Sequence, residues 1–430
     1  MHLPRLIIFF FGLSARSIVA ATSGSVVARN NDNVLQLTVH DYRAKSLRKR
    51  ELPLAPIQED LVSTRFSYIV NVTVAGQELA LVLDTGSHIT WVIGPSFICL
   101  DQEKVEQSSS QCMLGRPLDT SRSTTLQVEE GQFNIRYADN EFMQGSVVTT
   151  QVGIGGISRK QQPLSISHQR IGIVEKGCWF GDKVSSGLLG LAFPTSPTRF
   201  SILHTLFQEK STERIFSLAL TRPTRTGDHI SLPAYTSGGV LAFGGIPDVP
   251  TDGRWVHTPL VLSSPAASRR YTIMIDGFDI TPPPEAHNLR NYQKGGRYAS
   301  SPQIMAIDSG STMVQVPSRI AAYIASLFVP PAWQYHKGDA YYVDCTAKAP
   351  RVGIKIAGTL YYISHDDLIS PISEVDDDQC QLEIHPSSRE ILLLGTPWLK
   401  NVLVAFSFTS MSEGFMSKTG QVSIAGREKY

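Results

Sequence analysis

Two short segments of the chain place an aspartate in nearly the same surroundings. VLDTGSHITWV (82–92) and AIDSGSTMVQV (306–316) each run from apolar residues into Asp, a hydroxyl residue, Gly and Ser. The aspartates are Asp84 and Asp308, 224 positions apart. A single copy suggests only an Asx-type turn at a strand end. Two copies suggest two carboxylates on tight turns, where backbone N–H groups and hydroxyls can reach them.

A second pattern follows each aspartate segment. SGLLGLAFP (186–194) comes after the first and ILLLGTPWL (391–399) after the second, and both contain an apolar pair followed by Gly. Because the two patterns recur in the same order, we expect two related lobes. If the lobes face each other, their carboxylates lie about 3 Å apart and share one proton. Such a pair can act as general base on water and as general acid on a carbonyl oxygen.

The elements that position these residues are mostly short strands. Apolar and polar residues alternate over 66–74, and 78–84 is a second strand that leads into Asp84. Helical spacing is scarce: it predicts one helix near 200–207 and another near 320–328, with Ser318 available as N-cap. The fold class is therefore mainly β.

Composition narrows the possible functions. The 430 residues are 42% hydrophobic and 18% charged with a net charge of +1, which argues against a strongly basic nucleic-acid binder. Beyond the N-terminus no apolar run approaches the ~18–20 residues of a membrane helix. Five cysteines are too few for a disulfide-built scaffold. We expect no nucleic acid and no membrane among the partners.

The first fifty residues differ from the rest. A charged start, the apolar stretch 6–13 and small residues before Ala21 predict a signal peptide over 1–21; the alternative is a buried first strand or helix. Residues 22–50 end in Lys49-Arg50 and suggest a basic propeptide with a kexin-type processing site, or else a tail that stays attached. Residues 1–50 carry a net charge of +6 and the remainder −5, so the propeptide could inhibit an acidic cleft until acidification releases it.

From about Phe66 to Ala425 the sequence resembles the pepsin-like aspartic proteases, in particular secreted fungal endopeptidases. Further motifs support the resemblance: FNIRYADNEFMQG (133–145) is similar to the flap hairpin, and GGVLAFGGIP (238–247) to the strand that closes the N-terminal lobe. The resemblance implies two related β-barrel-like lobes with a catalytic cleft between them. It places the first Asp and the flap in 51–250 and the second Asp in 251–430. The implied activity is hydrolysis of peptide bonds at acidic pH by an Asp-Asp dyad that activates water, without cofactor or metal.

The resemblance also implies individual roles. Dyad support falls to the residues after each aspartate: Thr85, Gly86, Ser87, Ser309, Gly310 and Ser311. In this scheme Thr85 and Ser309 cross-brace the loops, and Ser87 and Ser311 hydrogen-bond the outer carboxylate oxygens. Tyr137 is expected to close over the substrate, supported by Trp91. The alternative for Tyr137 is an aromatic of the core.

Subsites and covalent features complete the expectations. Val82 and Leu188 map near the S1 pocket, and Asp139 either faces a P1 lysine or is a solvated turn residue. The disulfides implied by the resemblance are Cys99–Cys112 and Cys345–Cys380, which leaves Cys178 unpaired. Asn71 begins an Asn-Val-Thr glycosylation sequon.

Two questions of class and location stay open. A non-catalytic binding or inhibitor module on the same fold would typically lose an Asp, a neighbouring hydroxyl or the flap tyrosine, and this sequence keeps all of them. The signal peptide predicts a secreted monomeric enzyme that acts on polypeptides, with a vacuolar location as the alternative.

Overall fold

The structure is a computed structural model of residues 1–430. It describes residues 25–30, 33–38, 56–63, 67–137, 139–159, 162–192, 200–209, 212–222, 236–261, 270–288, 301–336, 340–371, 379–408, 411–412, 415–416 and 420–427. The chain forms two units, Met1–Leu54 and Ala55–Tyr430. The first unit contains one antiparallel hairpin of β1 (Ser25–Asn30) and β2 (Asn33–Thr38). The expected signal peptide and the Lys49-Arg50 site lie outside the described residues.

The second unit is mainly β, as the sequence predicted. Its first strands are β3 (Ile57–Ser63), β4 (Tyr68–Val74), β5 (Gln77–Asp84), β6 (Trp91–Cys99), β7 (Gln127–Arg136), β8 (Phe142–Ile154), β9 (Leu164–Cys178), β10 (Gly187–Gly190), β11 (Ile215–Leu220) and β12 (Thr236–Phe243). The later strands are β13 (Trp255–Pro259), β14 (Thr272–Ile275), β15 (Gly277–Thr281), β16 (Gln303–Ile307), β17 (Val314–Pro317), β18 (Tyr342–Asp344), β19 (Arg351–Ile356), β20 (Thr359–Ile363), β21 (Ile369–Pro371), β22 (Gln379–Leu382), β23 (Ile384–Ser387), β24 (Leu392–Leu394), β25 (Val402–Phe408), β26 (Met411–Ser412), β27 (Phe415–Met416) and β28 (Gly420–Gly426).

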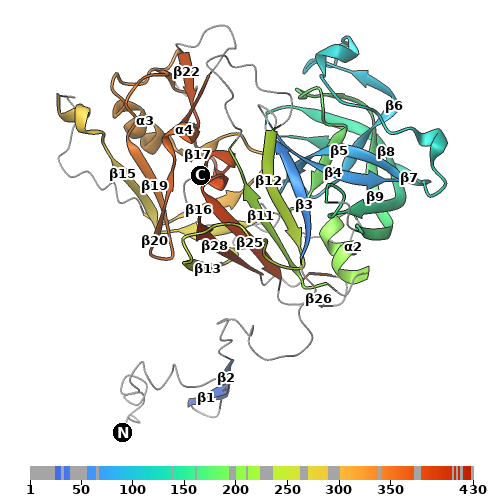
Figure 1. Cartoon of the computed structure of the whole chain (residues 1–430), viewed down its shortest axis with the longest axis horizontal. Helices are drawn as coiled ribbons and strands as arrows, with labels where there is room; N and C mark the ends of the chain where they lie inside the picture. The colour runs from blue at the N-terminus through green and yellow to red at the C-terminus, as the bar shows by residue number, and fades with distance from the viewer. Residues whose placement is uncertain are drawn as a thin grey trace. The chain divides into compact units, whose positions relative to one another are not determined.

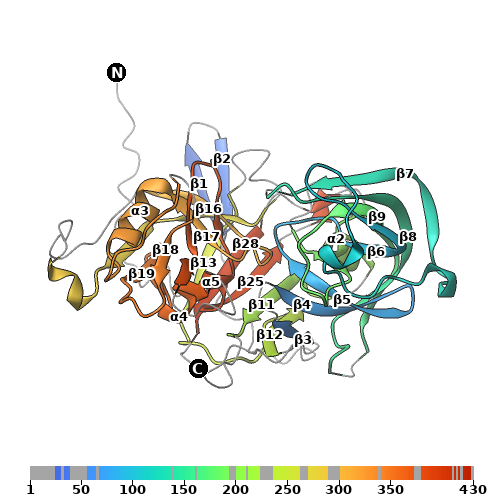
Figure 2. The same cartoon turned by 90° about the horizontal axis from the view of Figure 1, so that it is seen from above.

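The strands of this unit form two lobes joined by a common sheet. Thirteen strands pair in the order β13-β28-β25-β11-β12-β3-β4-β5-β10-β6-β9-β8-β7. Strands β4 to β10 make the N-terminal lobe, and β14 to β24, in separate smaller sheets, make the C-terminal lobe (Figure 1). Within this common sheet the two halves of the chain meet at the antiparallel pair β11–β25, which also lies between the lobes in the second view (Figure 2).

Asp84 is the last residue of β5 and Asp308 directly follows β16, and each of these strands is paired in parallel with a later one. In the N-terminal lobe β10 pairs with β5, with Leu188 opposite Val82 and Gly190 opposite Asp84. In the C-terminal lobe β24 pairs with β16, with Leu394 opposite Ile307. The two apolar–Gly patterns in the sequence are thus the strands that flank the two aspartate strands.

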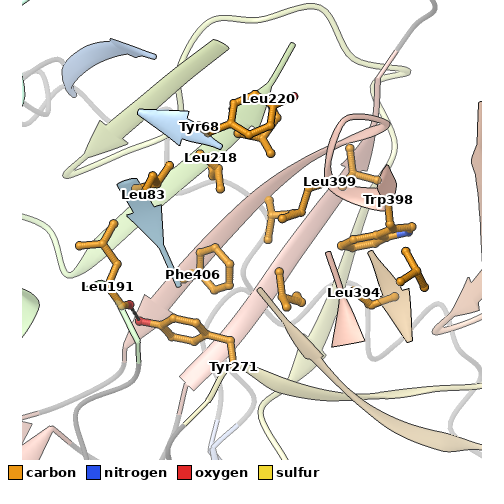
Figure 3. Close-up of a cluster of buried hydrophobic side chains, with 14 of the residues drawn as sticks. Tyr68, Leu83, Leu191, Leu218, Leu220, Tyr271, Leu394, Trp398, Leu399 and Phe406 are labelled. Atoms are coloured by element: carbon orange, nitrogen blue, oxygen red, sulfur yellow. Dashed lines mark hydrogen bonds between the residues drawn. The ribbon is translucent and has the colours of Figure 1, made fainter. Parts of the chain in front are cut away.

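A continuous apolar core lies beneath the two aspartate loops. Phe216 of β11 and Phe406 of β25 face each other in register, with ring centroids 4.6 Å apart, and the Tyr271 ring is 4.4 Å from Phe406. The Tyr271 hydroxyl donates to Leu191 O at 2.6 Å, which links the C-terminal half of the chain to the strand end beside Asp84 (Figure 3). Aromatic packing of this kind fixes one lobe against the other.

The helices are few and short. Helix α2 (Ile202–Glu209) and helix α3 (Ser318–Ser326) confirm the two helices predicted from apolar spacing, and α4 (His365–Leu368) and α5 (Thr396–Leu399) are single turns. Short 3-10 helices occur at η2 (Ser109–Gln111), η3 (Thr120–Arg122) and η5 (Pro284–Asn288). The suggested N-cap of α3 is wrong, because Ser318 is already helical and Pro317 occupies the cap. No helix in the described ranges is long and apolar enough to cross a membrane.

Two disulfides connect loops to strands. Cys99 is bonded to Cys112 and Cys345 to Cys380, with Cα–Cα distances of 5.8 and 5.0 Å. These are the pairs that the resemblance implied. Cys178, at the end of β9, is a buried free thiol.

Candidate active site

Each aspartate is held by the turn that follows it. The Gly86 N–H donates to Asp84 Oδ1 at 2.6 Å, and the Gly310 N–H donates to Asp308 Oδ1 at 3.0 Å. Both bonds span two residues, which is the Asx-turn arrangement expected for Asp followed by a small flexible residue. The repeated tetrapeptides therefore fold alike.

The two turns are cross-braced by their second residues. The Thr85 N–H donates to Ser309 Oγ at 3.0 Å, and the Ser309 N–H donates to Thr85 Oγ1 at 2.9 Å. Each hydroxyl in turn donates to a carbonyl of the opposite strand: Thr85 Oγ1 to Ile307 O at 3.0 Å, and Ser309 Oγ to Leu83 O at 2.8 Å. Thr85 and Ser309 are both buried, so these four bonds fix the loops face to face away from water.

The glycines let the carboxylates approach the opposite loop. A Cβ atom added to Gly86 would lie 2.5 Å from Asp308 Oδ2, and one added to Gly310 would lie 2.7 Å from Asp84 Cγ. Both distances are below any real van der Waals contact. Each carboxylate thus rests directly against the other loop's glycine, and the two acids share one small site.

Burial and mutual repulsion perturb both acids. Burial raises the pKa of Asp84, against the effect of hydrogen bonds from Ser87 and Gly86. Burial also raises the pKa of Asp308, and the neighbouring Asp84 charge raises it further. Two buried carboxyls in contact favour the state that holds one proton. Asp84 receives more hydrogen bonds to its charged form, so it is the better-stabilised anion of the pair.

The two serines that end the motifs behave differently. Ser87 is close enough to Asp84 for its hydroxyl to lower the pKa of that acid. The Ser311 hydroxyl instead donates to Met313 O at 3.0 Å, within its own loop. The pair expected to hold the outer carboxylate oxygens is therefore asymmetric in this structure.

The flap, which we define as residues 133–145, is a hairpin of β7 and β8. At its turn the Tyr137 N–H donates to Glu141 O at 2.8 Å, and Asn140 takes a positive φ of 76°. Trp91 Nε1 donates to the Tyr137 hydroxyl at 2.8 Å. Burial and the nearby Asp84 charge raise the pKa of Tyr137, so its hydroxyl stays neutral beside the acids.

Two of the predicted subsite residues lie in the apolar cluster next to this hairpin, and the third lies in its turn. Val82 and Leu188 are buried in one apolar cluster with Trp91, and the Tyr137 ring packs against that cluster. Asp139 is exposed at the turn, where its Oδ1 accepts from the Glu141 N–H at 3.1 Å. Sequence reasoning thus placed the flap tyrosine and its apolar surroundings together.

Two residues at this site were missed. The Trp179 ring stands edge-on to Trp91 at 5.2 Å and to Tyr137 at 5.6 Å. Glu141 is only 7% exposed, and one of its carboxyl oxygens accepts from the Phe180 N–H. An acidic residue between the turn and the apolar start of β8 was the available signal for Glu141, whereas no motif marks Trp179. Among the described residues no cluster of three or more His, Cys, Asp or Glu could hold a metal ion.

Comparison with known proteins gives a consistent result. The family model described as eukaryotic aspartyl protease matches residues 67–417. A probable aspartic-type endopeptidase of Aspergillus fumigatus is 29% identical over 361 residues, which is 79% of this chain and 76% of that protein. Secreted aspartic protease 8 of Candida albicans is 26% identical over 78% of this chain and 72% of its own. Rhizopuspepsin-1 of Rhizopus niveus is 24% identical over 79% of this chain and 75% of its own.

Proposed function

Because the chain belongs to the eukaryotic aspartyl protease family and is a pepsin-like hydrolase, we propose that Asp84 and Asp308 form the catalytic dyad. The dyad hydrolyses internal peptide bonds of polypeptides at acidic pH. The observation that carries the proposal is the reciprocal pair of hydrogen bonds between Thr85 and Ser309, since it holds both carboxyls in one site.

The chemistry follows from one proton shared by two acids. The ionised carboxylate accepts a proton from a bound water as the water oxygen attacks the peptide carbonyl carbon. The protonated carboxyl donates its proton to the carbonyl oxygen, which gives a gem-diol that is not attached to the enzyme. The first acid then protonates the amide nitrogen while the second removes a gem-diol proton. The C–N bond breaks and the dyad again holds one proton.

The flap supplies closure over the substrate. Tyr137, oriented by its hydrogen bond from Trp91, would exclude water from the reacting bond once a peptide is bound. Val82 and Leu188 make an apolar wall next to Trp91, which favours a bulky apolar P1 side chain. Asp139 offers a charge for a P1 lysine, although its Oδ1 is already bonded within the turn.

Maturation and location are part of the proposal. We infer a secreted enzyme, with a vacuolar location as the alternative, whose signal peptide is 1–21 and whose lobes span 51–250 and 251–430. The prosegment 22–50 would inhibit the monomeric enzyme until it is removed after Arg50. One similar protein is named a secreted aspartic protease, which favours the extracellular alternative.

Asn71 is proposed as a glycosylation site. It is half-buried on β4 and lines an open hollow of about 510 Å³ together with Glu78 and Arg116. The hollow leaves room for the first sugar of an N-linked glycan beside polar partners.

A peptide library tests the proposed activity directly. The processed protein is incubated with the library from pH 3 to 8, with and without pepstatin, and the products are sequenced by mass spectrometry. We expect internal cleavage in the acidic range that pepstatin abolishes, with apolar residues or lysine enriched at P1. Absence of pepstatin-sensitive cleavage at every pH would refute the proposed function.

A further inference from the structure

The flap is attached to the lobe at a second place besides the Trp91 hydrogen bond. We call Cys178–Phe180, the end of β9 and the two residues after it, the flap dock. Trp179 of the dock packs edge-on against the Tyr137 ring at 5.6 Å, and the Phe180 N–H donates to the Glu141 carboxyl. Phe142, directly after Glu141, is in register with Cys178. The dock therefore holds both the tyrosine of the flap and the base of its turn.

Glu141 is an unusual group for such a position. Its side chain is 7% exposed, and the described residues provide it with no ion pair. Burial raises the pKa of Glu141 to about 8, and the adjacent Asp139 charge contributes to the increase. The hydrogen bond from the Phe180 N–H favours the ionised carboxylate and lowers its pKa, but the effect of burial is larger, so the docked state holds the neutral carboxyl, whose carbonyl oxygen can still accept that bond.

The charged groups around Glu141 do not compensate an ionised carboxylate. Asp139 faces it from the turn, and the Cys178 thiol faces it from β9. Asp101 and Glu103, from the loop after β6, act on the same thiol.

The cationic side chains near the hairpin lie over the Phe142 ring and not against the Glu141 carboxyl. The charged groups of Arg136 and Lys104 lie 5.6 and 5.9 Å from the centroid of the Phe142 ring. The groups that interact with Glu141 itself are therefore acidic or neutral.

We propose that Glu141 is a positioning residue for the flap: protonated, it fastens the flap to the dock, and when it ionises toward neutral pH it releases the flap. Through the flap it positions Tyr137 and does not itself touch the reacting bond. This contact would restrict the protease to acidic surroundings, because the flap over the substrate loosens when the pH approaches neutrality. Its consequence for catalysis rests on the proposed function, but the docking itself does not.

The sign of the pH effect follows from linkage. In the docked state Glu141 keeps its proton to about pH 8, whereas a released, solvated Glu titrates near its ordinary value. Between the ordinary pKa of Glu and about pH 8, release of the flap is therefore accompanied by loss of one proton. The equilibrium constant for docking then falls by about tenfold for each unit of pH increase in this range. Docking is strongest below the ordinary Glu pKa.

Hydrogen exchange measures docking without catalysis. The full chain carrying Asp84→Asn is followed by mass spectrometry at pH 5, 6 and 7, with rates corrected for intrinsic exchange. We expect protection of the Phe180 amide and of the flap turn to fall by about tenfold per pH unit. Adding Glu141→Gln, which keeps the acceptor oxygen without a charge, should make this protection independent of pH. The β19–β20 hairpin, residues 351–363, is the internal reference and should not change.

The proposal would be overturned if protection from exchange depended on pH equally in the Asp84→Asn chain and in the chain that also carries Glu141→Gln. It would also be overturned if protection of the dock in the Asp84→Asn chain did not change with pH. A second variant tests the proposal if Glu141→Gln folds poorly. Asp139→Asn removes the charge next to Glu141 and keeps the acceptor oxygen, so the loss of protection between pH 5 and 7 should be smaller than in the chain with Asp84→Asn alone. A larger loss would contradict the proposal. In the active protein, KM should rise between pH 5 and 6.5 with Glu141 and stay level with Gln.

Discussion

Asp84 is the last residue of β5 and Asp308 directly follows β16, and each is held by the N–H of the glycine two residues later. The cross-braces between Thr85 and Ser309 are also nearly equal in both directions. What surrounds the two loops is not equal. The Asp84 loop has Ser87 on its carboxylate and the flap beside it, whereas the Ser311 hydroxyl binds Met313 O. A duplicated frame thus brings two acids together, and unequal surroundings distinguish them.

The largest expected effect comes from removing the carboxylate of Asp84 or of Asp308, which tests whether the two acids are equally necessary. Asp84→Asn and Asp308→Asn should each lower kcat by about 10³-fold or more, because either change destroys the shared proton. Single-turnover rates on a peptide substrate, with thermal unfolding as the folding control, measure this. Full activity in either variant would show that the two loops are not partners.

The buried ion pair that joins the two halves of the chain comes next in size. Asp367 of α4 is 3% exposed and accepts from Arg222, which follows β11, at 2.7 Å. Asp367→Ala removes the carboxylate that Arg222, Lys400 and Asn401 all contact, which leaves the charge of Arg222 with only the Asn401 amide oxygen, and it should cost about 3–5 kcal/mol. The exposed pair Asp60–Arg159 is the matched control, and Asp60→Ala should cost under about 1 kcal/mol.

Urea unfolding of both variants measures the difference. Similar costs at the two sites would mean that the Arg222–Asp367 pair does not hold the two halves in register.

Removing the hydroxyl of Thr85 or of Ser309 should cost similar amounts of stability, and less than the loss of the Asp367 carboxylate. Thr85→Val and Ser309→Ala each leave a buried N–H and a buried C=O without their hydroxyl partner, so each should destabilise by about 1–3 kcal/mol. Because the two hydroxyls share one network, the double variant should lose less than the sum. Differential scanning calorimetry of the three variants checks this, and strictly additive losses would argue against a shared network.

The smallest expected effect concerns the difference between Ser87 and Ser311. Ser87→Ala removes a hydrogen bond that favours ionised Asp84, so the acidic limb of the kcat/KM profile should move up by at most about one pH unit. Ser311→Ala should leave that limb in place, since Ser311 binds Met313 O. Equal shifts in the two variants would place Ser311 on Asp308 in the working enzyme.

Local repeats and alternation were sufficient to predict the mainly β fold and the two helices. They also identified both aspartate turns, because each turn and its partner strand lie within a short recognisable motif. The positions of Glu141 and Trp179 could not be predicted in this way, since both depend on where β9 ends relative to the flap. The Arg222–Asp367 pair spans 145 positions without any shared pattern. The N-cap of α3 was misplaced by one residue, because Ser318 is already the first helical residue and Pro317 occupies the cap position without a side-chain hydrogen bond.

The pH profile of kcat/KM in the processed Glu141→Gln variant, in which the flap adds no pH dependence of its own, tests whether Asp84 and Asp308 work with one shared proton. We expect a bell-shaped profile with two one-proton limbs: activity falls at low pH when both acids are protonated and at higher pH when both are ionised. Pepstatin should abolish activity across the whole bell. A profile with a single limb, or one that Asp308→Asn leaves unchanged, would contradict the shared proton.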